Sequence, residues 1–290
     1  MKTIDLQTQV TFERIMLATD FFPAAKIAQA YAVGLAQHDS STLEVATVVD
    51  LSLTLPSMDV ISESALEALR YSSEEGLRRL AEGISGVRVT RKVIEGFLPA
   101  SLLVDEAVKS NADLIVLGTT SKHGLKKFVL GSTAEEVIRT APCPVLTVGP
   151  HVSLPNFPVF FQRIVYATDL SSQGAKAADL ALSLGQTSGA KVYLCHVITE
   201  NEASNHGDCE ARSIASLKAL IPESVHDWCD PECIVEHGKS SEAILALAKR
   251  VNADLIVLGA RKSSFWVEYI RTGLTPALLA TANCPVLTVC

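Results

Sequence analysis

The eight residues NADLIVLG stand at positions 111–118 of this chain and again at positions 252–259. An identical octapeptide 141 positions later does not arise by chance, so the chain contains two copies of one ancestral unit. Two shorter landmarks recur in the same order: CPVLTV at 143–148 and 284–289, and ATD at 18–20 and 167–169. A repeat of about 140 residues has the size of a whole domain rather than of a solenoid unit.

The segment between the two copies predicts the domain boundary. Residues 149–162 read GPHVSLPNFPVFFQ, with three prolines and no helical periodicity. We therefore expect a first domain at 1–149, a linker at 150–161 and a second domain at 162–290.

Short, mostly continuous apolar runs alternate with helical patterns in each copy. Such runs are typical of strands that are buried on both faces of a parallel sheet. In the first copy the expected strands are Ile15–Ala18, Val45–Val49, Val87–Ile94, Leu114–Leu117 and Val145–Val148. In the second copy they are Ile164–Ala167, Val192–Ile198, Cys233–Val235, Leu255–Leu258 and Val286–Val289.

Helical periodicity separates these strands. Apolar residues recur at i, i+3, i+4 and i+7 in two clear cases: Ala134, Val137, Ile138 and Ala141, and Ile244, Leu247, Ala248 and Val251. Strands and helices that alternate in this way predict an α/β fold: two tandem, doubly wound, five-stranded parallel-sheet domains of Rossmann-like type. A ligand would bind at the carboxyl ends of the strands, where the strand order reverses.

Composition narrows the range of partners and locations. The chain has 290 residues, 48% of them hydrophobic, which suits two ordinary cores and argues against disorder. Its formal net charge of −7 offers no general attraction to nucleic acid or to an anionic membrane. The sequence shows no signal peptide and no run as long as a membrane span, so we expect a cytoplasmic protein. Seven cysteines, an odd number, favour reduced thiols over a complete disulfide framework.

Polar residues follow the first and the fourth expected strands. Thr19 and Asp20 come directly after the first strand, while Gly118 opens the polar loop GTTSKHG after the fourth. Thirteen residues beyond Gly118, the run Gly131-Ser132-Thr133 opens the next helix. Helix-start amides beside glycines, which let a ligand approach the backbone, predict an anion-binding site. Nearby positive charge would come from three lysines: Lys122, Lys126 and Lys127.

The chain resembles the universal stress proteins, and the resemblance covers nearly the whole length of both copies. Nucleotide-binding members of that family carry the loop G-x2-G-x9-G-[ST] after the fourth strand. The first copy keeps this spacing as Gly118-x2-Ser121-x9-Gly131-Ser132, with serine in place of the second glycine. If the family loop needs a positive φ there, serine would be strained by roughly 1–2 kcal/mol, which would weaken binding without abolishing it.

The resemblance implies an ATP site, with Mg²⁺, in the first domain. In family members that bind ATP, an acidic residue after the first strand holds the adenosine and a valine after the second contacts the base. The matching positions here are Asp20 and Val48, and the glycine loop would wrap the phosphates. The implied nucleotide-binding residues are Ala18, Thr19, Asp20, Val48, Gly118, Ser121, Lys122, Gly131, Ser132 and Thr133.

The second copy departs much further from the family loop. It reads Gly259-x2-Lys262, and the Gly-Ser pair is replaced by Thr272-Gly273. Pro276 predicts a shorter helix that begins at that residue. The loop instead carries three aromatic residues, which are more typical of packing or an interface than of base stacking: Phe265, Trp266 and Tyr269.

The candidate residues also have structural interpretations. Ser132 and Glu135 form an S-x-x-E capping box, so Ser132 could cap its helix without meeting a phosphate. Asp20 could cap the helix that follows it, although the recurrence of Asp169 in the same place favours a ligand role. Val48 is first of all a core residue, and the loop lysines are typical of a solvated face.

Cysteine and histidine residues gather in the second copy only. His226, Cys229 and Cys233 are ligand types that suit zinc, but they lack the paired C-x2-C knuckles of structural zinc sites. Cys229 and Cys233 are also close enough in sequence to act as a redox-responsive thiol pair. Neighbouring acidic residues would raise, not lower, the pKa values of these thiols.

The sequence carries no G-x-S-x-G elbow, H-E-x-x-H helix or P-loop lysine motif. We therefore expect no enzyme, and at most slow incidental ATP hydrolysis. The expected function is a stress response in which ATP or a related adenine nucleotide is a regulatory ligand of the first domain, with the second domain structural or partner-binding. The alternative is a nucleotide-free scaffold in which both loops are vestigial. An adenylyl-transferring enzyme is a distant third.

Both copies end in the same strand, which predicts an assembly. An apolar strand at a sheet edge invites pairing, and in the family this last strand mediates antiparallel dimerisation. We therefore expect residues 145–148 and 286–289 to pair within one chain, with the two domains related by a pseudo-twofold axis. A further homodimer of chains stays open.

Overall fold

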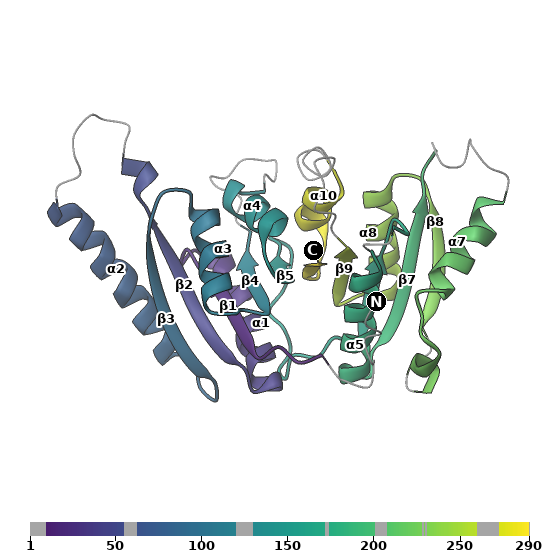
Figure 1. The fold of residues 1–290 in the computed structure, drawn as a ribbon, viewed down its shortest axis with the longest axis horizontal. Coiled ribbons are helices and arrows are strands. Elements are labelled where there is room, and N and C mark those ends of the chain that lie inside the picture. The colour runs from purple at the N-terminus through teal and green to yellow at the C-terminus, as the bar shows by residue number, and fades with distance from the viewer. Residues whose placement is uncertain are drawn as a thin grey trace. The chain divides into compact units, whose positions relative to one another are not determined.

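The computed structural model describes residues 10–54, 63–119, 130–171, 174–200, 208–227, 229, 231–259 and 273–289. Contacts between residues divide the chain into two compact units. The N-terminal unit is Phe12–Val159, and the C-terminal unit is Phe160–Cys290 together with the start of the chain up to Thr11. Each unit contains five parallel strands flanked by helices (Figure 1).

The strands of the N-terminal unit lie in the order β3-β2-β1-β4-β5, and every neighbouring pair is parallel. Their bounds are β1 Arg14–Ala18, β2 Thr42–Asp50, β3 Arg88–Gly96, β4 Leu114–Gly118 and β5 Val145–Val148. The chain runs outward from β1 through β2 to β3 and then returns to the other side of β1. The strand order therefore reverses between β1 and β4, where the fold class places a ligand crevice.

Helices cover both faces of this sheet. Their bounds are α1 Pro23–Asp39, α2 Glu63–Glu82, α3 Pro99–Lys109 and α4 Ser132–Thr140, with a short 3₁₀ turn η1 at Leu51–Thr54. Right-handed crossovers place α1 and α2 on one face and α3 and α4 on the other. Adjacent residues of β3 show the two faces, because Arg91 lines a groove with α2 whereas Lys92 pairs with Glu106 of α3. In Figure 1, α3 and α4 lie in front of the strands.

The C-terminal unit repeats this arrangement with the strand order β8-β7-β6-β9-β10. Its strands are β6 Arg163–Ala167, β7 Lys191–Ile198, β8 Glu232–His237, β9 Leu255–Gly259 and β10 Val286–Val289. Its helices are α5 Gly174–Ser188, α7 Cys209–Lys218, α8 Ser240–Val251 and α10 Leu274–Thr281, with a 3₁₀ turn η2 at Glu223–Asp227. Within the described parts of both units, no helix is long and apolar enough to cross a membrane.

The repeated LIVLG runs form β4 and β9. Residues Leu114–Leu117 are at most 5% exposed and Leu255–Leu258 at most 3%, because helices cover both faces of these strands. The predicted fold class and all ten predicted strands are confirmed, with bounds that differ by up to three residues. The expectation of burial on both faces is wrong for β3 and β8, the outer strands of their units, whose residues are exposed or half-buried.

The proline-bearing segment after β5 packs against the N-terminal unit. Val159 is 4% exposed, and a β-carbon added to Gly34 of α1 would lie only 2.1 Å from the Cγ2 atom of Val159. Gly34 is therefore the residue that lets Val159 reach the helix backbone. Contacts group residues up to Val159 with the N-terminal unit, although the sequence placed 150–161 in a linker.

Candidate functional site

Register brings the predicted ligand residues of the first copy to one edge of the sheet. Ala18, the last residue of β1, pairs with Ala46 of β2 on one side and with Leu117 of β4 on the other. Thr19 and Gly118, each one residue further on, therefore lie at the same level. The carboxyl ends of β1, β2 and β4 thus meet where the strand order reverses.

The turn after β1 is fixed by its own polar side chains. The Thr19 amide donates to the Ala46 carbonyl oxygen at 2.9 Å, which extends the ladder by one residue. Thr19 Oγ1 accepts from the Phe21 amide at 3.1 Å, and Asp20 Oδ1 accepts from the Phe22 amide at 3.1 Å. The N-cap of α1 is Phe22, with no side-chain cap, so the alternative role of Asp20 as a helix cap is wrong. Asp20 forms an Asx turn instead.

The C-terminal unit makes the same turn. Thr168 Oγ1 accepts from the Leu170 amide at 3.0 Å, and Asp169 Oδ1 accepts from the Ser171 amide at 3.0 Å. The residue after the aspartate has a positive φ in both units, 63° at Phe21 and 59° at Leu170. The recurrence of aspartate in both copies is therefore explained by backbone structure, and it does not by itself favour a ligand role.

Phe21 is a residue of this region that the sequence did not single out. A β-carbon added to Gly76, in the middle of α2, would lie 2.8 Å from Phe21 Cζ and 2.9 Å from its Cε1. The ring of Phe21 therefore packs against the helix backbone and ties the turn after β1 to α2. The sequence feature that could have pointed to this contact is an isolated glycine inside a 20-residue helix, where glycine is unfavourable unless something packs against it.

Val48 lies two residues beyond Ala46 on β2, in register with Ile94 of β3. It is half-buried, whereas the adjacent Thr47 and Val49 are buried. The interpretation of Val48 as first of all a core residue is therefore only partly right. A half-exposed valine at the carboxyl edge offers an apolar surface to a ligand.

Gly118 closes β4 in register with Val148 of β5. The following residue, Thr119, is 1% exposed, and its amide and hydroxyl both donate to the Val148 carbonyl oxygen, at 2.9 and 3.3 Å. Thr119 thus anchors the start of the predicted phosphate loop. Two predicted site residues of that loop, Ser121 and Lys122, lie outside the residues that the structure describes.

Helix α4 begins at Ser132, with Gly131 as its N-cap and no side-chain cap. The Glu135 amide donates to the Gly131 carbonyl oxygen at 2.9 Å. The predicted Ser132–Glu135 capping box is therefore wrong, because Ser132 is already inside the helix. Gly131 and Ser132 are exposed and Thr133 is half-buried, so all three stand at the open end of the helix.

The equivalent helix of the C-terminal unit starts at Leu274, with Gly273 as its N-cap. The prediction that it begins at Pro276 is wrong by two residues, although α10 is one residue shorter than α4, as expected. The predicted loop residues Lys262, Phe265, Trp266, Tyr269 and Thr272 lie outside the described part of the chain.

A buried histidine supports the turn of the C-terminal unit. His196 of β7 is 6% exposed, and its Nδ1 atom lies 2.9 Å from the Thr168 carbonyl oxygen. The same register position in β2 is occupied by Thr47. The sequence gave no reason to connect His196 with this turn, because the two are 28 positions apart and meet only through the β6–β7 pairing.

The metal and thiol candidates of the second copy gain no support. No group of three or more potential metal ligands occurs among the described residues, and the side chain of His226 is not among them. Cys229 Sγ donates to the Ala190 carbonyl oxygen at 3.5 Å, and burial raises the pKa of the Cys233 thiol. The raised pKa disfavours the reactive thiolate of Cys233.

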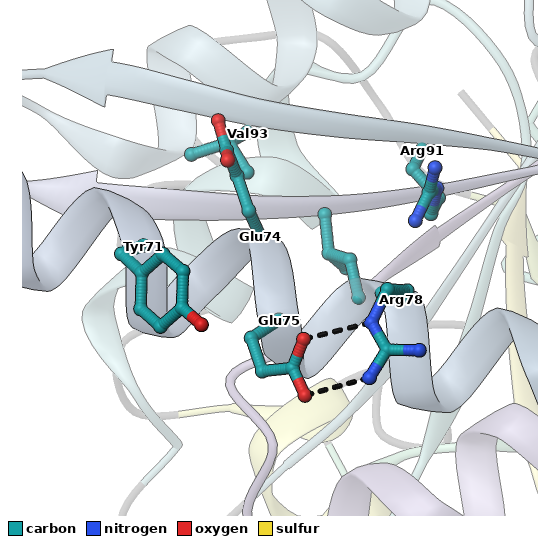
Figure 2. Close-up of a pocket in the computed structure, with 7 residues that line it drawn as sticks. Tyr71, Glu74, Glu75, Arg78, Arg91 and Val93 are labelled. Atoms are coloured by element: carbon teal, nitrogen blue, oxygen red, sulfur yellow. Dashed lines mark hydrogen bonds and ion pairs between the residues drawn. The ribbon is translucent and has the colours of Figure 1, made fainter.

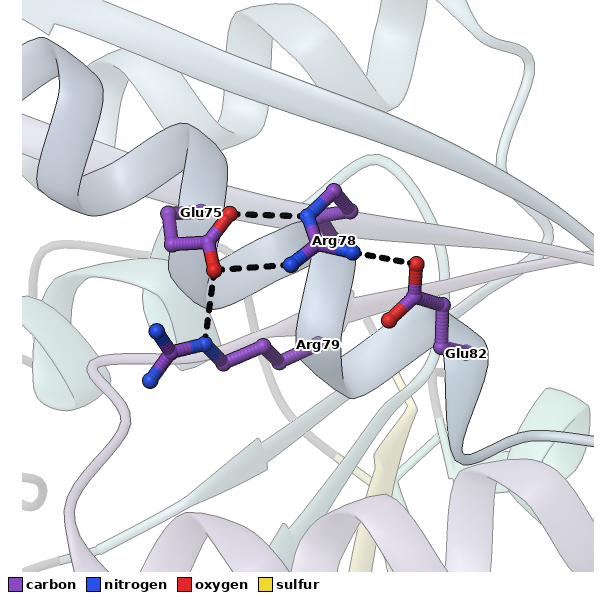
Figure 3. A network of polar contacts seen from close by, with 4 residues as sticks. All are labelled: Glu75, Arg78, Arg79 and Glu82. Atoms are coloured by element: carbon purple, nitrogen blue, oxygen red, sulfur yellow. Dashed lines mark hydrogen bonds and ion pairs between the residues drawn. The ribbon is translucent and has the colours of Figure 1, made fainter.

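A separate groove of about 490 Å³ lies between α2 and β3 (Figure 2). Two of its charged residues are paired within the helix, because Glu75 accepts from Arg78 at 2.7 and 2.8 Å, and Glu75 also accepts from Arg79 at 2.7 Å (Figure 3). These hydrogen bonds lower the pKa of Glu75 to about 2. The groove lies on the α2 face rather than at the carboxyl edge, and its network serves to stabilise an exposed helix.

The strand order and the reversal point of each unit define a tandem of two doubly wound α/β domains. Comparison with known proteins identifies the family. The model of the Universal stress protein family matches residues 11–149 and 160–289. A universal stress protein of Methanocaldococcus jannaschii is 36% identical over 144 residues, which are 47% of this chain and 82% of the relative. The chain therefore belongs to the universal stress protein family, which it matches twice.

Solved structures share the tandem fold. The crystal structure of a universal stress protein from Archaeoglobus fulgidus matches with a TM-score of 0.78 at 20% identity, over 95% of both chains. A functionally unknown protein from Pseudomonas aeruginosa matches with a TM-score of 0.56 at 19% identity, over 96% of this chain and 92% of that one. At these identities the likeness concerns the fold alone.

Proposed function

We propose that the N-terminal unit binds an adenine nucleotide, ATP with Mg²⁺, at the carboxyl edge of β1, β2 and β4. The nucleotide acts as a regulatory ligand of a stress-response protein, and the C-terminal unit is structural or binds a partner. If the nucleotide binds two conformations of the protein with different affinities, occupancy shifts the population toward the conformation that it binds more tightly, which changes partner binding.

The observation that carries this proposal is the open space at Gly131. Its φ of −64° is available to any residue, and a β-carbon there would meet no described heavy atom within 4 Å. Neither backbone conformation nor packing among the described residues therefore requires glycine. A phosphate group that approaches the exposed amides at the start of α4 would require it, and the helix dipole favours an anion there.

The remaining contacts suit the other parts of a nucleotide. Asp20 is exposed and spends one acceptor position on the Phe22 amide, while a carboxylate has about four, so hydroxyl groups of a ribose can still donate to it. Val48 supplies the half-exposed apolar surface for a base. We propose no catalytic role, because nothing in this set is placed as a nucleophile or a general base for an evolved reaction.

The second candidate is a nucleotide-free scaffold. It is favoured by Ser121, which stands where the family loop has glycine. It is also favoured by Thr272, which occupies the position of the second copy that corresponds to Gly131. In that case the open space at Gly131 would be a remnant of an ancestral site.

Calorimetric titration of ATP with Mg²⁺ into nucleotide-stripped full-length protein separates the two candidates. We expect one site per chain with a roughly micromolar Kd, lost in Gly131→Val. The matched control is Gly273→Val, which places the same side chain at the N-cap of α10 and should leave binding unchanged. A flat trace for the wild type, or equal binding by Gly131→Val, would establish the scaffold instead.

A further inference from the structure

A second pocket lies at the opposite, amino edge of the N-terminal sheet. It has a volume of about 290 Å³, close to the lower end of the roughly 300–1,000 Å³ range of small-molecule sites. It opens on the α3 face, where the first residues of β1, β2 and β3 meet the carboxyl end of α3. Its polar lining consists of Arg14, Thr42, Glu44, Arg88, Thr90 and Ser110.

Glu44 is the unusual residue of this lining. It is half-buried on β2, and its Oε1 atom is fully buried with no hydrogen-bond partner. Burial raises the pKa of its carboxyl group, and the nearby charge of Glu106 raises it further, while a side-chain hydrogen bond with Ser110 and the charge of Lys92 lower it. A buried acceptor without a donor is destabilising, so the fold gains nothing from Glu44 in this state.

Neighbouring charges do not account for Glu44. Glu106 of α3 is 7% exposed and has its own partner, because Lys92 Nζ lies 3.0 Å from its Oε1 atom. Glu44 itself takes part in no ion pair among the described residues. The pocket therefore contains one carboxylate whose interactions are incomplete.

Two arginines, Arg14 and Arg88, line the pocket. Arg14 donates through Nη1 to the Ser110 carbonyl oxygen at 3.3 Å, which leaves four of its five N–H donors for other partners. Arg88 is exposed and has no hydrogen-bond or ion-pair partner within the described part of the chain. Paired guanidinium donors are the side chains best suited to a carboxylate, which they bind in bidentate fashion.

The second copy carries different residues at this place. The Thr19 amide donates to the Ala46 carbonyl oxygen and the Thr168 amide to that of Cys195, so Ala46 and Cys195 are equivalent positions. Two residues earlier in each strand, Glu44 is therefore equivalent to Tyr193. The strand pairing and the NADLIVLG repeat align the other positions. The polar residues Lys92, Glu106 and Ser110 correspond to the apolar residues Ile234, Leu247 and Val251.

Other lining positions are charged in the second copy, with Arg163 for Arg14, Lys191 for Thr42 and Glu232 for Thr90. The two copies therefore differ at this place mainly in the carboxylate of Glu44 and in its neighbours on β3 and α3. The second copy folds with Tyr193 in place of Glu44, and replacing buried charged groups is often neutral or stabilising, so folding alone does not require this carboxylate.

Arg163 of the second copy corresponds to Arg14 and makes a comparable contact, since its Nε donates to the Asn252 carbonyl oxygen at 2.8 Å. What is particular to the first copy is the carboxylate of Glu44 together with Arg88, whose position is Asp230 in the second copy, and a functional requirement explains this pair.

We propose that this pocket binds a small zwitterion that carries an amine and a carboxylate, such as a free amino acid. The carboxylate of the ligand faces Arg14 and Arg88, and its ammonium group donates to Glu44. A purely anionic ligand would be repelled by Glu44 and a purely cationic one by the arginines, so only a molecule with both charges satisfies the set. The site lies at the amino edge and does not depend on nucleotide binding at the carboxyl edge.

Nuclear magnetic resonance of ¹⁵N-labelled full-length protein tests the proposal. The common L-amino acids are titrated one by one to millimolar concentration, and the amide signals of residues 14–16, 42–44 and 88–90 are followed. We expect saturable shifts at these amides for at least one amino acid. The amine and the carboxylic acid that each retain only one of its two charged groups should bind about tenfold more weakly or worse.

Variants assign the contacts. Arg88→Ala should weaken binding about tenfold, whereas Arg91→Ala, which removes an exposed arginine from the opposite face of the same strand, should leave it unchanged. Glu44→Gln should weaken binding of the amino acid but not of its deaminated acid. The proposal is overturned if no amino acid gives saturable shifts, if the deaminated acid binds as well as the amino acid, or if the two arginine variants behave alike.

Discussion

The ring of Phe21 lies so close to the backbone of α2 that Gly76 has no room for a β-carbon: the atom would sit 2.8 Å from Phe21 Cζ. This contact joins the turn that carries Asp20 to the middle of a helix that is distant in sequence. It makes Gly76 a residue of the candidate nucleotide site without direct contact with a ligand.

Gly76→Ala should therefore not give the gain of about 1 kcal/mol that alanine normally brings to a helix interior. The added methyl group displaces Phe21, so we expect unchanged or lower stability and weaker nucleotide binding. In the background of Phe21→Ala, the same substitution should stabilise the protein by about 1 kcal/mol. Urea denaturation of the four proteins of this double-mutant cycle gives the coupling, and a coupling near zero would contradict the contact.

Asp20→Asn removes the charge of this side chain but keeps its ability to form the turn after β1. Asparagine also forms Asx turns, so the melting temperature should change little, whereas the loss of a charged acceptor should weaken ATP binding about tenfold. Asp169→Asn makes the same change in the identical turn of the C-terminal unit and serves as the control. Calorimetry that finds equal affinities for the two variants would remove Asp20 from the site.

Glu44→Gln should stabilise the protein in a pH-dependent way. The pKa of Glu44 in the folded state is raised above its ordinary value of 4.5, so ionisation on going to neutral pH disfavours folding. We expect the variant to have a higher free energy of unfolding at about pH 7, by about 1 kcal/mol. The difference should shrink as the pH falls below 4.5, where the wild-type carboxyl is protonated in both states. Denaturant titrations at both pH values measure it, and a difference that does not depend on pH would contradict the buried charge.

Glu75→Gln should lower the melting temperature slightly at low ionic strength. The pKa of Glu75 is lowered to about 2 by Arg78 and Arg79, so its stabilising contribution is present at neutral pH and is lost as the pH falls from 4.5 towards 2. Because the network is exposed, molar salt should abolish the difference. Glu74→Gln, at the adjacent exposed position, is the control and should have no salt-dependent effect. A Glu75→Gln effect that persists in molar salt would argue against an electrostatic origin.

Sequence patterns predicted the framework of the fold because the signals for buried strands are local. The LIVLG runs are apolar at every position, and any chain that buries both faces of a strand needs such a run. The predicted second strand began at Val45 and therefore missed Glu44, although β2 starts at Thr42. A carboxylate inside a buried strand resembles a loop residue unless its unusual environment is known.

The described candidate residues lie at the carboxyl edge where the fold class predicts a ligand crevice, but whether they bind a ligand stays a prediction, and the roles of individual side chains were not readable from sequence. An aspartate directly after a strand is typical of a ligand residue and equally of an Asx turn, so the sequence around Asp20 does not distinguish the two roles. Ser132 matches a capping box, yet the helix begins one residue too early for that box to form. The prolines of 150–161 indicate the absence of a helix, but they carry no information on packing such as that of Val159 against Gly34.

The open surroundings of Gly131 also affect how this chain can change over generations. Most positions of a domain are held by folding, so their replacement is removed from a population whether or not a ligand matters. Gly131 is free of that constraint among the described residues, because many side chains could stand there without strain or clash. If the proposed nucleotide site is under selection, the glycine should persist in descendants of this chain, and it should drift once that selection ceases.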